Sequence, residues 1–285
     1  MTRTRTDLAL AAAFATVCLW ASAFVGIRSA GHHIGAGALT LGRVSVATVA
    51  LGALAAFRRE PLPPRSDLLR VALVGLLWLG AYNLLLNGAE HDLDAGTAAM
   101  LVNIAPVFLA VLAGFFLGEG FPRTLFTGCA VALAGVVLIG IATSEHGLDS
   151  VTGALLCIGA AAAYAVAIVI QKPLLERSSG LMVTFLACAV AAVVTLPFAP
   201  DLADTGDAGA LAWTVYLGLF PTAIGFTTWA YALKRTEAGR LGAFTYLVPP
   251  LAVLLGWIFL SETPPGLALA GGLLCLLGVA MTRRT

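Results

Sequence analysis

Ten apolar runs, most of them about 20 residues long, divide this sequence from end to end. A helix needs about 20 residues to cross the hydrocarbon of a bilayer, where only helices or closed barrels satisfy the backbone. Of the 285 residues, 60% are hydrophobic and 11% are charged, against about 25% charged in a soluble domain. Alternating barrel strands are absent, so the sequence predicts an all-α integral membrane protein with ten transmembrane helices. These helices are expected at approximately 8–28, 35–56, 69–89, 95–118, 123–142, 151–171, 180–199, 209–232, 239–260 and 265–282.

The basic residues between these runs predict the orientation, because cytoplasmic loops are enriched in Lys and Arg. With a cytoplasmic N-terminus, 14 of the 16 basic residues face the cytoplasm. Arg28 alone faces outward, and Arg43 lies within a run. We therefore expect both termini in the cytoplasm and the protein in a bacterial inner (plasma) membrane.

The N-terminal run has some features of a cleavable signal peptide, with Arg3 and Arg5 before it and Ala21-Ser22-Ala23 within it. It continues to about Ile27, which is long for a signal peptide, and it has a counterpart in the second half of the chain. We expect it to remain as the first helix.

An internal duplication organises the chain. Residues 95–136 reappear without a gap as 238–279, a shift of 143, with 12 of 42 positions identical. The scarcer matched residues are Gly96/Gly239, Pro106/Pro249, Glu119/Glu262, Pro122/Pro265, Gly128/Gly271 and Gly135/Gly278. Two five-helix repeats, 1–146 and 147–285, follow from this match. Five is odd, so the second repeat must be threaded in the opposite sense. Inverted repeats are typical of alternating-access carriers, with substrate at mid-depth between the halves.

These motifs resemble the EamA-like ten-helix carriers of the drug/metabolite transporter superfamily. The resemblance rests on Trp20, Arg43, and an Ala-Gly opening, a mid-helix proline and a terminal Gly/Ser-Glu in each half. It implies an EamA-like repeat in each half and transport, often outward, of amino acids, nucleotide sugars, other metabolites or drugs. The sequence departs from the pattern where Tyr246 replaces Asn103 in the second copy, where Pro249 is followed by a second proline, and where Tyr164 replaces Trp20.

Polar side chains within the runs are the candidates for a substrate pathway, because they are costly in hydrocarbon. Arg43 lies about two turns from the outer end of its helix. Two interpretations stay open: it binds an anionic solute or a gating partner, or it snorkels to the outer surface or caps backbone carbonyls of neighbouring helices. In the third helix, Tyr82, Asn83 and Asn87 either line a path or bond between helices.

Repeat-related residues add further candidates. Asn103 and Tyr246 lie one turn before Pro106 and Pro249, which are expected to kink their helices. Trp20 and Tyr164 are expected as cavity aromatics or, alternatively, as packing residues. The weaker candidates are Thr227, Thr228, Tyr231 and Thr245.

Other matched residues favour structural roles. Glu119 and Glu262 end helices, and each is expected to bond the N–H groups that open the next helix, rather than to couple protons. Gly128 and Gly135, with Gly271 and Gly278, predict a tight contact of the fifth and tenth helices, either within the chain or across a homodimer.

The sequence lacks the motifs that are typical of other classes of protein. The sequence has no GxSxG, no HExxH, no embedded Asp pair and no Walker motif. The five cysteines are scattered through apolar runs, and the net charge of +1 does not suggest nucleic acid. We expect no enzyme, cofactor or metal, and small-molecule substrate and membrane lipid as partners. The prediction is a secondary exporter of a small metabolite; an importer, or a non-transporting scaffold or receptor, is the alternative.

Overall fold

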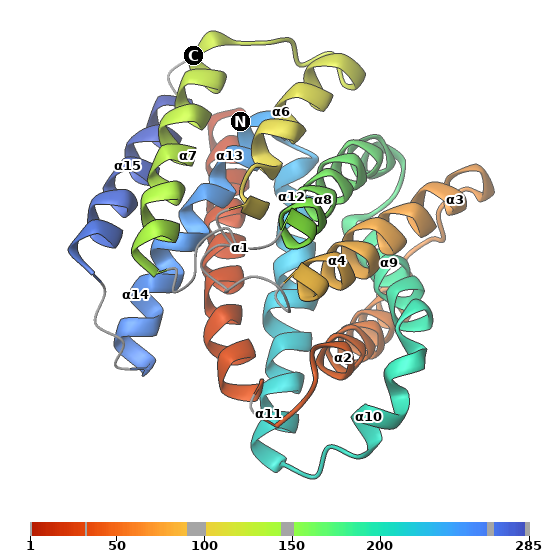
Figure 1. The fold of residues 1–285 in the computed structure, drawn as a ribbon. Helices are drawn as coiled ribbons and strands as arrows, with labels where there is room; N and C mark the ends of the chain where they lie inside the picture. The colour runs from red at the N-terminus through yellow and green to blue at the C-terminus, as the bar shows by residue number, and fades with distance from the viewer. Residues whose placement is uncertain (1, 32, 90–100, 144–150, 261–264, 283–285) are drawn as a thin grey trace. The chain divides into compact units, whose positions relative to one another are not determined.

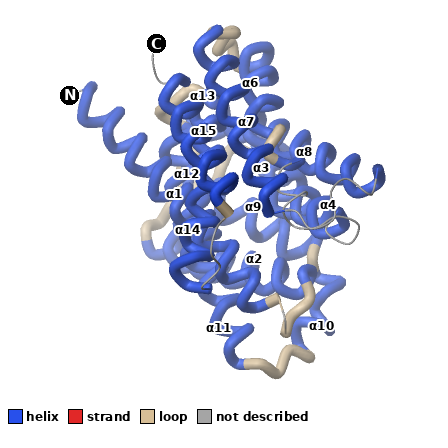
Figure 2. The backbone as a smooth tube through the Cα atoms, turned by 60° about the vertical axis from the view of Figure 1, so that its left-hand side comes forward, coloured by secondary structure: helices blue, strands red, loops and turns tan. Residues whose placement is uncertain are grey.

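The computed structural model is all-α, as the sequence predicted. It describes residues 2–31, 33–89, 101–143, 151–260 and 265–282, and every regular element within these ranges is a helix (Figure 1 and Figure 2). Seven of these helices are long and apolar enough to cross a membrane, a bent pair forms an eighth candidate span, and two shorter apolar helices, Ala105–Phe116 and Gly266–Thr282, complete ten segments among the described residues. They coincide with the ten apolar runs, so the chain is a multi-pass integral membrane protein.

The first half of the chain contains α1 (Thr2–Ala30), α2 (Ala36–Phe57), α3 (Arg65–Val74), η1 (Gly75–Ala81), α4 (Tyr82–Ala89), α6 (Ala105–Phe116) and α7 (Arg123–Thr143). The second half contains α8 (Val151–Arg177), α9 (Gly180–Val194), η2 (Leu196–Phe198), α10 (Ala199–Ala203), α11 (Ala208–Leu217), η3 (Gly218–Ile224), α12 (Gly225–Leu233), α13 (Ala238–Ala243), η4 (Phe244–Leu247), α14 (Val248–Leu260) and α15 (Gly266–Thr282). Here η1 and η3 are π-helices, and η2 and η4 are 3-10 helices.

The seventh span departs from the straight helix that we expected over 180–199. It bends by 59° between Gly180–Val194 and Leu196–Ala203. Pro197 and Pro200 follow the bend, and each proline lacks the N–H that would continue the α-helical hydrogen bonding. Thr195, at the bend, is buried and donates its hydroxyl to the carbonyl of Ala191 at 2.8 Å.

The helices form two compact units that each draw on both halves of the sequence. One unit, which we call unit 1, contains Met1–Ala81 and Ile170–Arg235; the other, unit 2, contains Tyr82–Val169 and Thr236–Thr285. In unit 1, α1 packs on α11 and α12, and α2 packs on α9. In unit 2, α6 packs on α13 and α7 packs on α15.

Unit 1 contains the two π-helices at repeat-equivalent positions. η1 spans Gly75–Ala81 and η3 spans Gly218–Ile224, so both ends of the two elements differ by the same 143 residues as the duplicated segment. Each opens on a glycine pressed against a neighbouring helix. A Cβ on Gly75 would lie 2.5 Å from the carbonyl oxygen of Ala187 in α9, and one on Gly218 would lie 2.6 Å from Cβ of Val46 in α2. The repeat therefore extends to the third and eighth spans, although sequence identity alone did not reveal it there.

Unit 2 contains the glycine contact that the sequence left open. A Cβ on Gly135 would lie 2.5 Å from the carbonyl oxygen of Gly271, and a Cβ on Gly271 would lie 2.5 Å from that of Gly135. Gly128 and Gly278 approach each other in the same way. The contact joins α7 and α15 within one chain, and Figures 1 and 2 show these helices side by side. Residue numbers rise along one helix as they fall along the other, so the repeat-related helices run antiparallel, as inverted threading requires.

Candidate functional site

Four aromatic side chains, here called the aromatic cluster, meet in unit 1. Trp20 of α1 lies with its ring centroid 5.0 Å from that of Trp229 and 5.4 Å from that of Phe226, both in α12. Trp78 of η1 completes the group at 4.5 Å from Phe226. Trp78, Phe226 and Trp229 are buried, whereas Trp20 is half-buried. Trp20 is therefore the least buried ring of this cluster.

The π-helix η3 brings Trp20 and Arg43 to adjacent residues. The Trp20 indole donates to the carbonyl of Pro221 at 3.2 Å, and Nε of Arg43 donates to Oγ1 of Thr222 at 3.0 Å. Thr222 is fully buried, whereas Arg43 is half-buried. Arg43 is thus held against another helix of its own unit by a hydrogen bond that its guanidinium donates.

The local sequence explains why η3 has this form. Pro221 has no N–H, so in an α-helix the carbonyl of Leu217 would lose its hydrogen-bond donor. The hydroxyl of Thr222 supplies a donor instead, at 2.7 Å from that carbonyl. Pro221 and Thr222 together stabilise the wider turn that presents Thr222 to Arg43.

Small polar side chains of α1 face the same helices. Oγ1 of Thr16 lies 2.8 Å from Oγ1 of Thr228, and Oγ of Ser22 lies 2.8 Å from the Tyr216 hydroxyl. Of these four, we singled out only Thr228 from the sequence, as a weaker candidate. Thr16, Ser22, Tyr216 and Thr222 were missed because an isolated hydroxyl in an apolar run carries no signal about its partner.

Other predicted pathway residues gather in unit 2. The rings of Tyr82 in α4 and Tyr164 in α8 lie 6.4 Å apart. Tyr164 is buried, and Asn83 and Asn103 are half-buried. Asn87 belongs to α4, but its side chain lies outside the described residues.

The helix interruption before each matched proline recurs in both repeats. Asn103 lies in a turn just before α6, in which Pro106 is the second residue. In the second copy the 3-10 helix η4 precedes Pro249, the second residue of α14. Thr245 in η4 is half-buried and donates its hydroxyl to a carbonyl of α13.

Tyr246 is packed inside unit 2 in this conformation. Its exposed fraction is 0%, and its hydroxyl has no hydrogen-bond partner among the described residues. An unpaired buried hydroxyl is costly. The sequence suggested that Tyr246 lines a path, but here it faces no open surface.

Glu119 caps a different helix from the one that we expected. Its carboxylate accepts hydrogen bonds from the N–H groups of Ala238 at 2.6 Å and Gly239 at 2.9 Å, which open α13. The sequence led us to expect α7, the next helix along the chain. The positive end of α13 stabilises the carboxylate, and the pairing is long-range, which local reading does not reveal. Glu262 lies outside the described residues.

Asp67 is a buried acid that we did not single out from the sequence. It lies in the first turn of α3, and its side chain is 1% exposed. Its carboxylate pairs at 3.5 Å with Arg70, one turn further along α3, and at 3.5 Å with Arg177, the last residue of α8. Its burial and its pairing with Arg177 depend on a helix that is distant in the chain, which local sequence does not reveal.

Comparison with known proteins decides the family. The model of the EamA-like transporter family matches residues 7–141 and again residues 151–284. The chain belongs to the EamA-like transporter family. It is therefore a transporter with a small-molecule substrate and not an enzyme.

Similar proteins cover nearly the whole chain. It is 40% identical over 272 residues to a "Probable terminal-alkyne amino-acid exporter" of Streptantibioticus cattleyicolor, spanning 94% of this chain and 91% of that protein. It is 31% identical to the "Uncharacterized transporter YdfC" of Bacillus subtilis, spanning 93% and 87%, and 26% identical to a "Probable amino-acid metabolite efflux pump" of Salmonella typhimurium, spanning 94% and 92%. A crystal structure titled "Crystal structure of protein" has a TM-score of 0.82 at 22% identity, covering 96% of each chain, and supports the fold alone.

Proposed function

We propose that this protein exports amino acids or closely related carboxylate-bearing metabolites by alternating access. Two relatives are named as a probable amino-acid exporter and a probable amino-acid metabolite efflux pump. Residues 1–146 and 147–285 act as the two inverted repeats, and both termini lie in the cytoplasm of a bacterial cell. The protein works in the inner membrane, and one similar protein is named an inner membrane transporter.

The observation that carries this proposal is the pairing of Arg43 and Trp20 on adjacent residues of η3. An α-amino acid presents a carboxylate and an ammonium group only a few bonds apart. A guanidinium binds a carboxylate through strong, geometrically defined hydrogen bonds. The ring of Trp20 offers its face to the ammonium group, as a cation–π partner, or to an apolar side chain.

The two π-helices support the transport cycle. π-helical turns are rare and are found frequently at functional sites, and here two of them occupy repeat-equivalent positions among the described residues. In a carrier built from inverted repeats, equivalent elements exchange roles as one side closes and the other opens. We infer that η1 and η3 are the positions where the third and eighth spans change shape.

Efflux from proteoliposomes tests the role of Arg43. The vesicles are loaded with a labelled amino acid, with the amine that lacks its carboxylate, or with its carboxamide. We expect the wild-type protein to release the amino acid selectively. Loss of a charge-assisted hydrogen bond costs about 1.5–3 kcal/mol, so Arg43→Ala should weaken apparent affinity for the amino acid by about 10- to 150-fold, with little effect on the amine.

Two further variants separate recognition from folding. Thr222→Val removes the acceptor for Arg43 but keeps the charge of Arg43, and we expect an intermediate loss of transport. Because this variant also removes the donor to the Leu217 carbonyl, its folded yield is measured alongside. Arg123→Ala, at the exposed start of α7, is the matched arginine control and should transport normally. Equal losses of amino-acid and amine transport in folded Arg43→Ala protein would contradict carboxylate recognition.

A further inference from the structure

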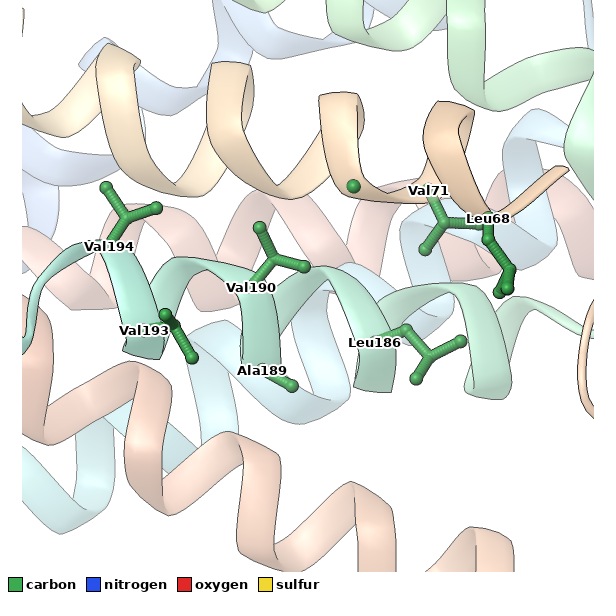
Figure 3. Close-up of a pocket in the computed structure, with 8 residues that line it drawn as sticks. Leu68, Val71, Leu186, Ala189, Val190, Val193 and Val194 are labelled. Carbon is green, nitrogen blue, oxygen red and sulfur yellow. The ribbon is translucent and has the colours of Figure 1, made fainter. Parts of the chain in front are cut away.

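An apolar groove runs along the outside of unit 1 between α3 and α9. Its volume is about 360 Å³, and Figure 3 shows its walls. The lining side chains are all aliphatic: Leu68, Val71, Ala72, Leu186, Ala189, Val190, Val193 and Val194. Leu68 is 43% exposed and Val193 is 65% exposed. From Leu186 to Val194 the groove extends about 12 Å at 1.5 Å per residue.

The two helices that form the groove run parallel, so the groove has two different ends. Gly75 faces Ala187 near the middle of α9, and Gly80, further along the third span, faces Val194 at the end of α9. The starts of both helices therefore lie at one end. The distribution of basic residues predicts that this end faces the cytoplasm.

The predicted cytoplasmic end of the groove carries arginines. Arg65 is the first residue of α3 and lies on the same helix face as Leu68, three residues further on. Arg70 and Arg177 have side chains that are 51% and 53% exposed, and both approach the single buried carboxylate of Asp67. One acid between two guanidinium groups leaves a positive excess, to which Arg65 adds.

Neighbouring acids do not cancel this excess. Glu176 is exposed beside Arg177, and Glu60 is half-exposed before α3. The exposed Arg58 and Arg59 precede Glu60 in the chain. Residues 58–70 contain four arginines but only two acids, Glu60 and Asp67.

These features together fit one kind of occupant. A groove of aliphatic side chains at membrane depth suits an acyl chain, and a basic patch on the cytoplasmic side of transmembrane helices suits an anionic lipid headgroup. We propose that the α3/α9 groove holds an acyl chain of an anionic phospholipid and that Arg65 and Arg70 bind its phosphate. The site is separate from Arg43 and Trp20, so it is independent of the proposed transport role.

Native mass spectrometry of the full chain in detergent micelles tests this proposal. The protein is titrated with phosphatidylglycerol, with phosphatidylcholine of the same acyl chains, and with inorganic phosphate. We expect tighter binding of phosphatidylglycerol and no competition from inorganic phosphate. Attraction of anionic lipid contributes about 1 kcal/mol per arginine near the surface, which is about five-fold in affinity. Arg65→Gln should therefore weaken phosphatidylglycerol binding about five-fold, and Arg65→Gln with Arg70→Gln about 25-fold.

A groove-filling variant tests the acyl-chain part. Ala189→Phe places a ring in the groove and should remove tight phosphatidylglycerol binding, whereas Ala134→Phe, at an exposed position of α7, should not. Arg123→Gln is the matched charge control. Should Arg70→Gln fail to fold because Asp67 loses a partner, Arg65→Gln alone decides. Equal affinity for the two lipids, displacement by inorganic phosphate, or unchanged binding in Ala189→Phe would each overturn the proposal.

Discussion

The contact between α7 and α15 makes a quantitative prediction, because two glycines face each other's backbone there. A Cβ added at Gly135 or at Gly271 would lie 2.5 Å from the carbonyl oxygen of the other, and ordinary contact begins at 3.4 Å. The helices must separate by about 0.9 Å, the difference between these distances. Backbone atoms cannot rotate away as side chains do.

The energies follow from this geometry. Overpacking costs about 1–3 kcal/mol, and a contact with backbone belongs near the upper value. Replacing glycine by alanine within a helix stabilises the helix by up to about 1 kcal/mol, because alanine has the higher helix propensity. We expect Gly135→Ala and Gly271→Ala each to lower the free energy of unfolding by about 2 kcal/mol. The double variant needs only one separation of the helices, so we expect a loss of about 1–2 kcal/mol, well below the sum of about 4 kcal/mol.

Reversible unfolding in mixed detergent and SDS micelles, followed by circular dichroism, measures these values. Gly266→Ala is the control, because nothing lies within 4 Å of a Cβ at that position, and it should change stability by less than about 0.5 kcal/mol. Additive losses, or single variants as stable as the wild type, would refute the shared contact.

Two further predictions concern elements described above. Glu119→Gln removes the charge that caps α13, which should cost about 1 kcal/mol in the same unfolding assay; a neutral result would show that Ala238 and Gly239 do not depend on the carboxylate. The π-helices η1 and η3 should exchange backbone amide hydrogens faster than α7, because irregular turns open locally at lower free energy. Hydrogen exchange read by mass spectrometry checks this, and equal protection would count against their role as hinges.

The sequence predicted the helical framework because apolar runs of membrane length leave few alternatives. When each repeat has an odd number of helices, the second repeat crosses the membrane in the opposite orientation. The antiparallel contact of α7 with α15 at Gly135 and Gly271 agrees with this orientation. The bend at Thr195 and the π-helix η3 were not predicted, because each depends on which carbonyls lose a donor to a proline and what replaces it. η1 has no proline, and no sequence signal for it was found. Pro221 is visible in the sequence, but the hydroxyl of Thr222 as its substitute is visible only in three dimensions.

The candidate site was predicted only in part, for a related physical reason. Arg43 stands out because a charged side chain is rare in hydrocarbon, and Trp20 stands out because it is repeat-related to Tyr164. Both side chains donate hydrogen bonds to η3 from about 180–200 residues away in the chain. A single sequence does not reveal such long-range contacts. Asp67 was overlooked, and Glu119 was matched to the wrong helix, because their partners Arg177 and Ala238 are distant in the chain.

The equivalence of η1 and η3 bears on whether the carrier favours its inward-open or its outward-open state. On the proposed mechanism, in which two inverted copies exchange conformations, residues that are identical in both copies and have equivalent surroundings contribute equally to the inward-open and outward-open states. Positions where the copies differ then bias the equilibrium. Within the π-helices, Trp78 stands where the second copy has Pro221, a bulky ring against a residue without an N–H. On that mechanism, the divergence of the copies since the duplication, rather than their likeness, sets which of the two states the carrier favours.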